Sequence, residues 1–328
     1  MNVYDFQKQL NYSWKDLFRK KKEDKKFIES DIATIKAHDI YFFSIDKNSL
    51  PGVSINISHN LNIGSFPKAK GWKVIGNNKK IEISVNNIVY IDFFIKLMNL
   101  ILTKIYLKNL TEEKSVKCFL ENLIFAKNFF EDDNAPRKLT KESQIGLYGE
   151  IHVLSKILTK KLNNKNLIDS WTGPSKKHDF TREKILIEIK TTTTNSKKIN
   201  TSSNNQIAPV FDRALNIIFL QIKNSSSGFS LVDLINNYLT ILKTESEILH
   251  NDFLLKLAQC NYLDIHNDEY SQKYEIDKTN YFEVRDDFPY IKKVETPDEL
   301  SDLSITYKID LEKCENFRIN EEQLLEKI

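Results

Sequence analysis

The stretch HDFTREKILIEIKTTTT, residues 178–194, decides the fold of this chain of 328 residues. It holds two runs of β-strand type joined by the charged turn Arg182-Glu183-Lys184. Side chains on a strand alternate between its two faces, so Glu188 and Lys190 share one face and the intervening isoleucines occupy the other. Because the turn sends the first run back antiparallel to the second, we expect Asp179 to stand beside Glu188.

This arrangement of charges points to a metal ion. Two neighbouring carboxylates repel each other unless a cation neutralises them, and hard oxygen ligands favour Mg²⁺ or Mn²⁺ over zinc. Such a cation acidifies a bound water and offsets the charge on a phosphodiester under attack. Asp179 and Glu188 would be metal ligands, and Lys190 would hold or deprotonate the water and stabilise the oxyanion. The alternative is an ordinary edge hairpin with solvated charges.

The segments around this hairpin predict a sheet flanked by helices. We expect a helix over residues 144–162 with Ser143 as its cap, and another helix near Gln206–Arg213. Residues 215–222, LNIIFLQI, form a continuous apolar run of the buried-strand type. The fold class expected for this region is α/β (α+β), with a mixed central sheet flanked by helices.

The rest of the chain is expected to form three further regions. Short strand-like runs predict a β-rich N-terminal domain at residues 1–87, and two amphipathic helices predict a helical connector at 88–139. The core is placed at 140–225, and a helical and mixed, partly irregular C-terminal region at 226–328. The expected strands outside the core are 40–45, 52–57, 71–76, 80–85, 281–285 and 304–310, and the expected helices are 88–107, 111–131 and two across 230–259.

Composition indicates a globular protein with a real core. Apolar side chains make up 41% of the residues, yet no apolar run approaches the roughly 18 residues that a bilayer span needs. The N-terminus has no apolar signal region, and the three cysteines lack the CxxC spacing of disulfide frameworks or zinc sites. We therefore expect a cytoplasmic protein with reduced thiols and no membrane association.

Charge is distributed unevenly along the chain. Residues 151–200 carry eleven basic and four acidic side chains, and residues 245–328 carry ten basic and 21 acidic ones. We expect the basic surplus to form a positive face beside the paired acids, where a polyanion would bind, and the acidic region to lie away from it. A solvated lysine-rich surface is the alternative interpretation.

Together, Asp179, Glu188 and Lys190 resemble the signature of the PD-(D/E)XK nuclease superfamily. The surrounding motifs resemble one branch, whose members lie in bacterial restriction and phage-defence clusters, often beside an ATPase and a cytosine methyltransferase. Those motifs are GLYGE (146–150), WTGP (171–174), HDF (178–180), IEIKT (187–191) and Ser202-Ser203 with Gln206. One departure is His178, which stands where the superfamily often has proline.

The resemblance implies a restriction-endonuclease-like core and a Mg²⁺-dependent endonuclease, with Mn²⁺ able to substitute. Glu150 matches the helix acid that approaches the metal directly or through water, and Gln206 matches a polar residue near the active site. Trp171 is interpreted as a core or hinge aromatic. Short hydroxyl and lysine side chains suit contacts with the DNA backbone; they are Thr191, Lys197, Lys198, Ser202 and Ser203.

Several functions remain open at this stage. The leading hypothesis is cleavage of double-stranded DNA in a restriction or anti-phage system, by a homodimer because both strands must be cut, with the ATPase or methyltransferase as partner. The runner-up is a catalytically inactive subunit that binds DNA or protein. A nuclease for RNA or single strands ranks last, because no aromatic-rich basic stripe is present.

Overall fold

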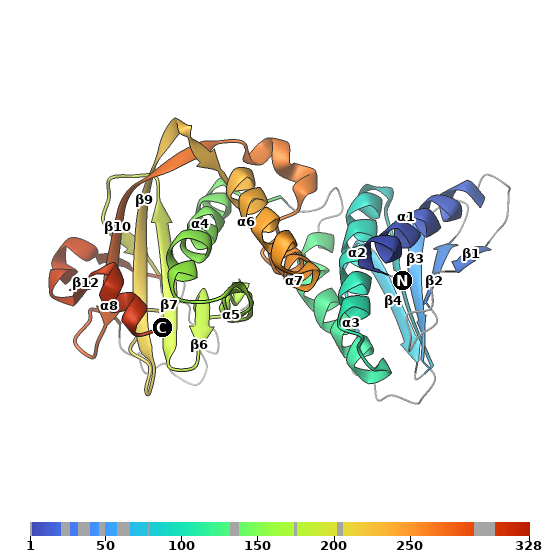
Figure 1. Cartoon of the computed structure of the whole chain (residues 1–328), viewed down its shortest axis with the longest axis horizontal. Coiled ribbons are helices and arrows are strands. Elements are labelled where there is room, and N and C mark those ends of the chain that lie inside the picture. The colour runs from blue at the N-terminus through green and yellow to red at the C-terminus, as the bar shows by residue number, and fades with distance from the viewer. Residues whose placement is uncertain are drawn as a thin grey trace, which may run out of the picture. The chain divides into compact units, whose positions relative to one another are not determined.

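The computed structural model describes residues 2–20, 27–31, 40–45, 50–57, 66–77, 79–131, 138–173, 176–201, 206–291 and 306–328. The chain forms two compact units, whose elements are shown in Figure 1. The first unit is Met1–Lys138 with Leu242–Ile265, and the second is Leu139–Ile241 with His266–Ile328. Among the helices of these described ranges, none is both long and apolar enough to cross a bilayer.

The first unit contains an antiparallel sheet of five strands in the order β1-β2-β3-β5-β4. The expected strands of the N-terminal region are therefore confirmed. The strands are β1 (Phe27–Asp31), β2 (Ile40–Ile45), β3 (Leu50–Asn56), β4 (Trp72–Asn77) and β5 (Lys80–Val85). The helices are α1 (Val3–Lys20), α2 (Ile91–Leu107), α3 (Glu112–Ala126) and α7 (Glu247–Gln259).

Helix α1 shows how the first unit is held together. Its apolar residues recur every three or four positions, which places Phe6, Leu10, Trp14 and Leu17 on one buried stripe. The indole of Trp14 donates to Asn99 Oδ1 of α2 at 2.9 Å. Helix α2 in turn contacts α3, α7 and β3. The two long helices expected after residue 87 are thus present and form the apolar centre of this unit.

The second unit is built on a mixed five-stranded sheet in the order β12-β10-β9-β7-β6. Strand β7 pairs antiparallel with β6, where Phe180 faces Ile187, and parallel with β9, where Ile185 faces Ala214. The mixed sheet expected for the core is therefore confirmed. Its strands are β6 (Phe180–Arg182), β7 (Ile185–Thr192), β9 (Ala214–Ser230), β10 (Lys273–Val284) and β12 (Arg318–Ile319).

Helices cover one face of this sheet. Helix α4 (Lys141–His152) lies along β7, as Figure 1 shows, and α5 (Asn164–Ser170) contacts β6. Gly149 makes the approach of α4 possible, because a Cβ built there would lie 1.8 Å from Thr191 Oγ1. Gly146 has no such role, since a Cβ there would meet nothing within 4 Å.

The opposite face of the sheet is covered by the C-terminal region. Leu186 joins a buried apolar cluster formed mainly by β9 and by residues after position 280; its other members include Leu215, Ile217, Phe219, Phe282, Ile309, Cys314 and Phe317. Strand β11 (Lys308–Asp310) pairs antiparallel with β8 (Lys198–Asn200), and Glu312 lies 3.3 Å from Lys197. The expectation that the acidic region lies away from the basic segment is therefore wrong: apolar burial brings it back.

The expected helix near Gln206–Arg213 is also wrong. These residues form turns, with Val210 and Arg213 joined in an isolated bridge. Pro209 explains the difference, because it lacks an N–H and disfavours helical geometry in the residue before it.

The helix of the core begins and ends differently from the prediction. Its cap is Thr140, whose hydroxyl accepts from Ser143 N, so Ser143 lies inside the helix. After His152 the chain continues as one π-helical and one 3₁₀ turn up to Lys160. The four-part domain division remains a prediction; β9 runs across its boundary at residue 225.

Two glycines of α4 offer a matched test of this packing. Gly149→Ala should destabilise the protein by about 1–3 kcal/mol, the scale of overpacking in a close contact. Gly146→Ala should be neutral or stabilising by up to about 1 kcal/mol, since alanine favours helix where space is open. Urea denaturation of both variants and the wild type measures the difference. Equal effects at the two positions would contradict the close approach of α4 to β7.

Candidate active site

The β6–β7 hairpin fixes the position of Asp179. Strand β6 begins at Phe180, so the N–H of Ile189 lies beyond its end, and Asp179 Oδ2 accepts from that N–H at 2.6 Å. The backbone of Asp179 is held from the other side, because its carbonyl oxygen accepts from Thr172 N at 3.0 Å. The expected hairpin through residues 182–184 is thus present, and it anchors the first acid on the strand that carries the second.

Three side chains form a closed polar triangle on the opposite side of β7 from α4. Lys190 Nζ lies 2.7 Å from Glu188 Oε1 and donates to Gln206 Oε1 at 3.1 Å. Gln206 Nε2 donates to the same Glu188 Oε1 at 2.7 Å. Glu188 is only 1% exposed, and its second oxygen, Oε2, is buried without a hydrogen-bond partner among the described residues. This orphaned oxygen has the chemistry of a ligand for a hard cation.

His178 holds the backbone of Gln206. Its Nε2 lies 3.0 Å from the carbonyl oxygen of Gln206, which can only accept, so Nε2 carries the proton. Burial is the main cause that lowers the pKa of His178, followed by the charge of Lys177. The residue that replaces the superfamily's proline therefore connects the first acid to the segment of Gln206.

Glu150 approaches from the helix side of the sheet. Its Oε2 accepts from Trp171 Nε1 at 2.8 Å, and Trp171 is fully buried. The interpretation of Trp171 as a core aromatic is confirmed, but its indole N–H also orients an acid, which the sequence did not predict. The short separation of WTGP and HDF along the chain was the signal for this contact, because Trp171 and Phe180 form a β-bridge.

The three carboxyl groups share an environment that disfavours their negative charge. Burial, and next the charge of Asp179, raise the pKa of Glu188 to about 8. Burial raises the pKa of Asp179 to about 6, against the N–H of Ile189 and the charge of Lys190. Burial and the charge of Asp179 also raise the pKa of Glu150 well above its ordinary value. A cation placed among them would reverse these shifts.

The donor set fits a hard divalent cation with two protein carboxylates. In the described part of the chain no group of three or more His, Cys, Asp or Glu side chains is arranged to hold a metal ion. Mg²⁺ does not need one, because it commonly keeps several waters and uses one or two carboxylates plus substrate phosphates. Asp179 and Glu188, with the orphaned Oε2, suit that role, while Glu150 is tied to Trp171.

Basic and hydroxyl residues near the triangle occupy different positions. Lys177 was not among the residues expected from the sequence. Burial lowers its pKa, and the negative charge of Glu188 opposes that shift. Thr191 packs against Gly149 with its hydroxyl buried, so it faces α4 and not the polar loop. Lys198 is exposed on β8, and Lys197 pairs with Glu312. Ser202 and Ser203 lie outside the described residues.

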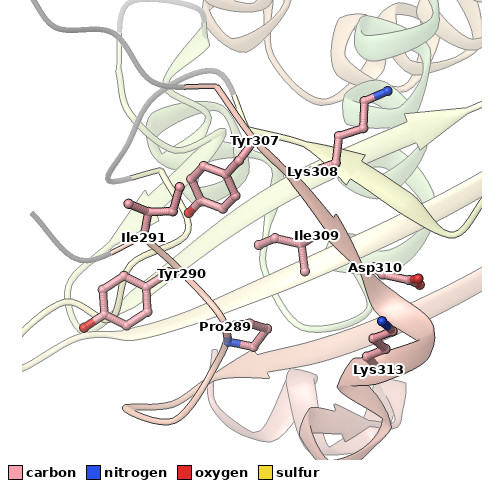
Figure 2. Close-up of a pocket in the computed structure, with 8 residues that line it drawn as sticks. All are labelled: Pro289, Tyr290, Ile291, Tyr307, Lys308, Ile309, Asp310 and Lys313. Atoms are coloured by element: carbon pink, nitrogen blue, oxygen red, sulfur yellow. The ribbon is translucent and has the colours of Figure 1, made fainter. Parts of the chain in front are cut away.

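A separate concavity of about 440 Å³ lies beside β11 (Figure 2). Tyr290 and Tyr307 contribute their rings to its wall, with Ile309 from β11. None of the residues that the sequence singled out as candidate site residues lines it. The candidate active site is the carboxylate and lysine cluster on β7, which lies apart from this concavity.

This fold and this cluster are consistent with the core of a PD-(D/E)XK protein: a mixed sheet, a helix bearing an acid, and a strand bearing a glutamate and a lysine two residues apart. The chain matches, over residues 10–312, the family model described as "Putative PD-(D/E)XK family member, (DUF4420)". Because that match covers most of the chain, the protein belongs to this family. Searches of the curated proteins and of the solved structures found no match.

The buried carboxylate of Glu188 predicts an unusual effect on stability. In the presence of a chelator, Glu188→Gln should raise the free energy of unfolding by about 1–2 kcal/mol, because an incompletely satisfied buried charge is removed. Glu283→Gln is the control: Glu283 pairs with Lys327 at 2.6 Å, both side chains remain partly exposed to solvent, and the change should be small. Chemical denaturation in EDTA measures both. A clear loss of stability in Glu188→Gln alone would mean that this carboxylate is a satisfied structural group.

Proposed function

We propose that this protein is a Mg²⁺-dependent endonuclease that hydrolyses phosphodiester bonds of double-stranded DNA in a restriction or anti-phage system. The observation that carries the proposal is the polar triangle on β7: Glu188 and Lys190 share one face within 2.7 Å of each other. Asp179 is anchored one residue away, on the N–H of Ile189. The family membership supports a possible nuclease, and the substrate and the defence role are our proposals.

Each residue of the cluster has a role that its contacts support. A bound divalent cation would supply an acidified water and offset charge on the phosphodiester. Asp179 and Glu188 would hold that cation through carboxylate oxygens, and Glu150 would interact with it through water. Mn²⁺ would substitute because it prefers the same oxygen ligands.

Lys190 is positioned for the transition state. Two of the three N–H donors of its ammonium are directed by Glu188 and Gln206 among the described residues. An ammonium oriented in this way can donate to the attacking water or to a phosphate oxygen as negative charge builds there. Hydrolysis adds water to phosphorus and breaks one P–O bond, and the water's protons end on the leaving oxygen and in solvent. Gln206 would act by orienting both Lys190 and Glu188.

The partners belong to the proposal as well. A chain with one cluster would cut both strands as a symmetric homodimer. Lys197 and Lys198, with Thr191, Ser202 and Ser203, would contact the DNA backbone; the contact with Glu312 and the packing of Thr191 make Lys198 the strongest of the described three. An ATPase or a methyltransferase of the same defence system would be the protein partner, and the setting would be the cytoplasm.

Metal response separates the roles of the three residues. Asp179→Asn and Glu188→Gln should weaken Mg²⁺ binding and cleavage together, with partial recovery in excess Mn²⁺, because a neutral amide cannot replace an anionic ligand. Lys190→Ala should keep its metal affinity and lower the cleavage rate by about 10²-fold or more, the scale of one lost transition-state contact. Calorimetric metal titration and single-turnover cleavage of modified and unmodified duplexes measure these effects.

Lys243→Ala is the matched control, since Lys243 is exposed on α6 (Leu231–Glu245) outside the cluster, and it should behave as wild type. If wild type and variants bind DNA and metal alike and none cleaves any duplex, the endonuclease proposal fails. The inactive DNA-binding or protein-binding subunit would then replace it.

A further inference from the structure

The turn Val210–Arg213 presents one phenylalanine to solvent. Phe211 is 91% exposed, more than any other large apolar side chain in the described part of the chain. The turn is tight: Arg213 N donates to Val210 O at 3.2 Å, and Asp212 has a φ of 60° in the left-handed region. Single exposed apolar residues are common on proteins. Phe211 differs from such residues because both ends of its turn are connected to the cluster on β7.

Both ends of the turn are tied to the candidate active site. On one side the turn begins four residues after Gln206, whose side-chain amide contacts Glu188 and Lys190. On the other side Ala214 N donates to Lys184 O at 2.7 Å, and Ala214 faces Ile185, the first residue of β7. Because a strand rises about 3.3 Å per residue, this end of β7 lies roughly 10 Å from Glu188.

The charges around Phe211 suit a polyanion. Arg213 follows Phe211 by two residues, and the backbone of Lys184 is bonded to Ala214 at the end of the turn. Both cations are exposed, and neither forms an ion pair within the described ranges. The charge of Arg213 also contributes to lowering the pKa of His178, which places this cation near the cluster. Glu183 and Asp212 also lie in these turns, so the surface is mixed in charge.

The dimensions match a duplex that runs past the cluster. Bases along one strand are about 3.4 Å apart, so the roughly 10 Å from Ile185 to Glu188 corresponds to about three base steps from a phosphate held by a cation at the cluster. Apolar side chains such as phenylalanine insert between base steps in proteins that kink DNA, unstacking the pair they enter. A phenylalanine on a hydrogen-bonded turn is suited to that action because the turn presents its ring to solvent.

We propose that Phe211 inserts between stacked bases of the DNA duplex held at the carboxylate and lysine cluster, with Lys184 and Arg213 binding the flanking phosphates. This inference rests on the proposed function and adds to it that the duplex is unstacked a few base pairs from the bond that is cut. A protein partner is less suited to this surface, because stable interfaces need about 800 Å² from each side around an apolar centre. Phe211 is the one exposed large apolar residue of the described parts of β6, β7 and the 206–213 segment.

Duplexes with a single 2-aminopurine, whose fluorescence rises on unstacking, report the insertion directly. The label is moved one base pair at a time along the duplex, and Ca²⁺ replaces Mg²⁺ so that binding occurs without cleavage. Wild type should raise the fluorescence roughly twofold or more at one or two adjacent positions, as expected for a base step opened by a wedge. Phe211→Ala should abolish this rise and weaken duplex binding by less than about tenfold, because phosphate contacts supply most of the affinity.

Phe229→Ala is the matched control, since Phe229 is an exposed phenylalanine at the end of β9, 49% accessible to solvent, and should behave as wild type. Phe211→Trp should keep the rise, which separates a wedge from a mere effect on folding. Arg213→Ala should weaken binding and reduce its salt dependence.

The outcomes distinguish this inference from the proposed function. If wild type binds and cleaves duplexes but shows no rise, or if the rise persists in Phe211→Ala, the wedge is overturned and the endonuclease stands. If Phe211→Ala leaves the rise unchanged but alters self-association in sedimentation, Phe211 belongs to a protein interface and the wedge is likewise overturned. If wild type neither binds nor cleaves any duplex, both proposals fail together.

Discussion

The second unit of this protein is organised around a carboxylate that is almost completely buried. Glu188 is buried in the middle of β7, near a second acid, and only one of its two oxygens has hydrogen-bond partners among the described residues. Burying such a charge is costly unless it is paired and fully hydrogen-bonded. Lys190 and Gln206 contact one oxygen of Glu188. The other oxygen still needs a partner, and this need makes the site suited to a divalent cation.

The neighbours of Glu188 are explained by this requirement. His178 holds the backbone of Gln206, Trp171 holds Glu150, and Gly149 lets α4 approach the strand closely enough to bring that acid near. Each of these residues acts on the site through another, as supporting contacts do when a reactive group must be held in one geometry. The helix side of the sheet supplies Glu150, and the opposite side supplies Lys190 and Gln206.

Local patterns in the sequence were sufficient for the hairpin and its polar face. Alternation along residues 185–190 and a charged turn at 182–184 specify which side chains share a face, since strand periodicity is a local property. The lack of a helix at Gln206–Arg213 also has a local cause, because Pro209 disfavours helical geometry. The anchoring of Asp179 on a backbone N–H could not be predicted, because it depends on where β6 begins.

The place of the C-terminal region could not be predicted for a different reason. Its charge suggested separation from the basic segment, yet Ile309, Cys314 and Phe317 are buried with Leu186. Apolar burial is worth about 25 cal/mol for each Å² removed from water, whereas exposed charges are screened by solvent and salt. Few apolar residues are enough to outweigh a net charge, and a charge count alone does not show which ones they are.

Because these apolar residues come late in the sequence, they are synthesised after the strands that they cover. Leu186 and Glu188 emerge roughly 120 residues before Ile309, which at about 5–20 residues per second leaves their face of the sheet uncovered for roughly 6–25 seconds. For most of that interval the sheet that carries the candidate cluster lacks β10, and throughout it the sheet lacks β12. A chain that stopped before Ile309 would leave Leu186 and its apolar neighbours on β9 without this cover.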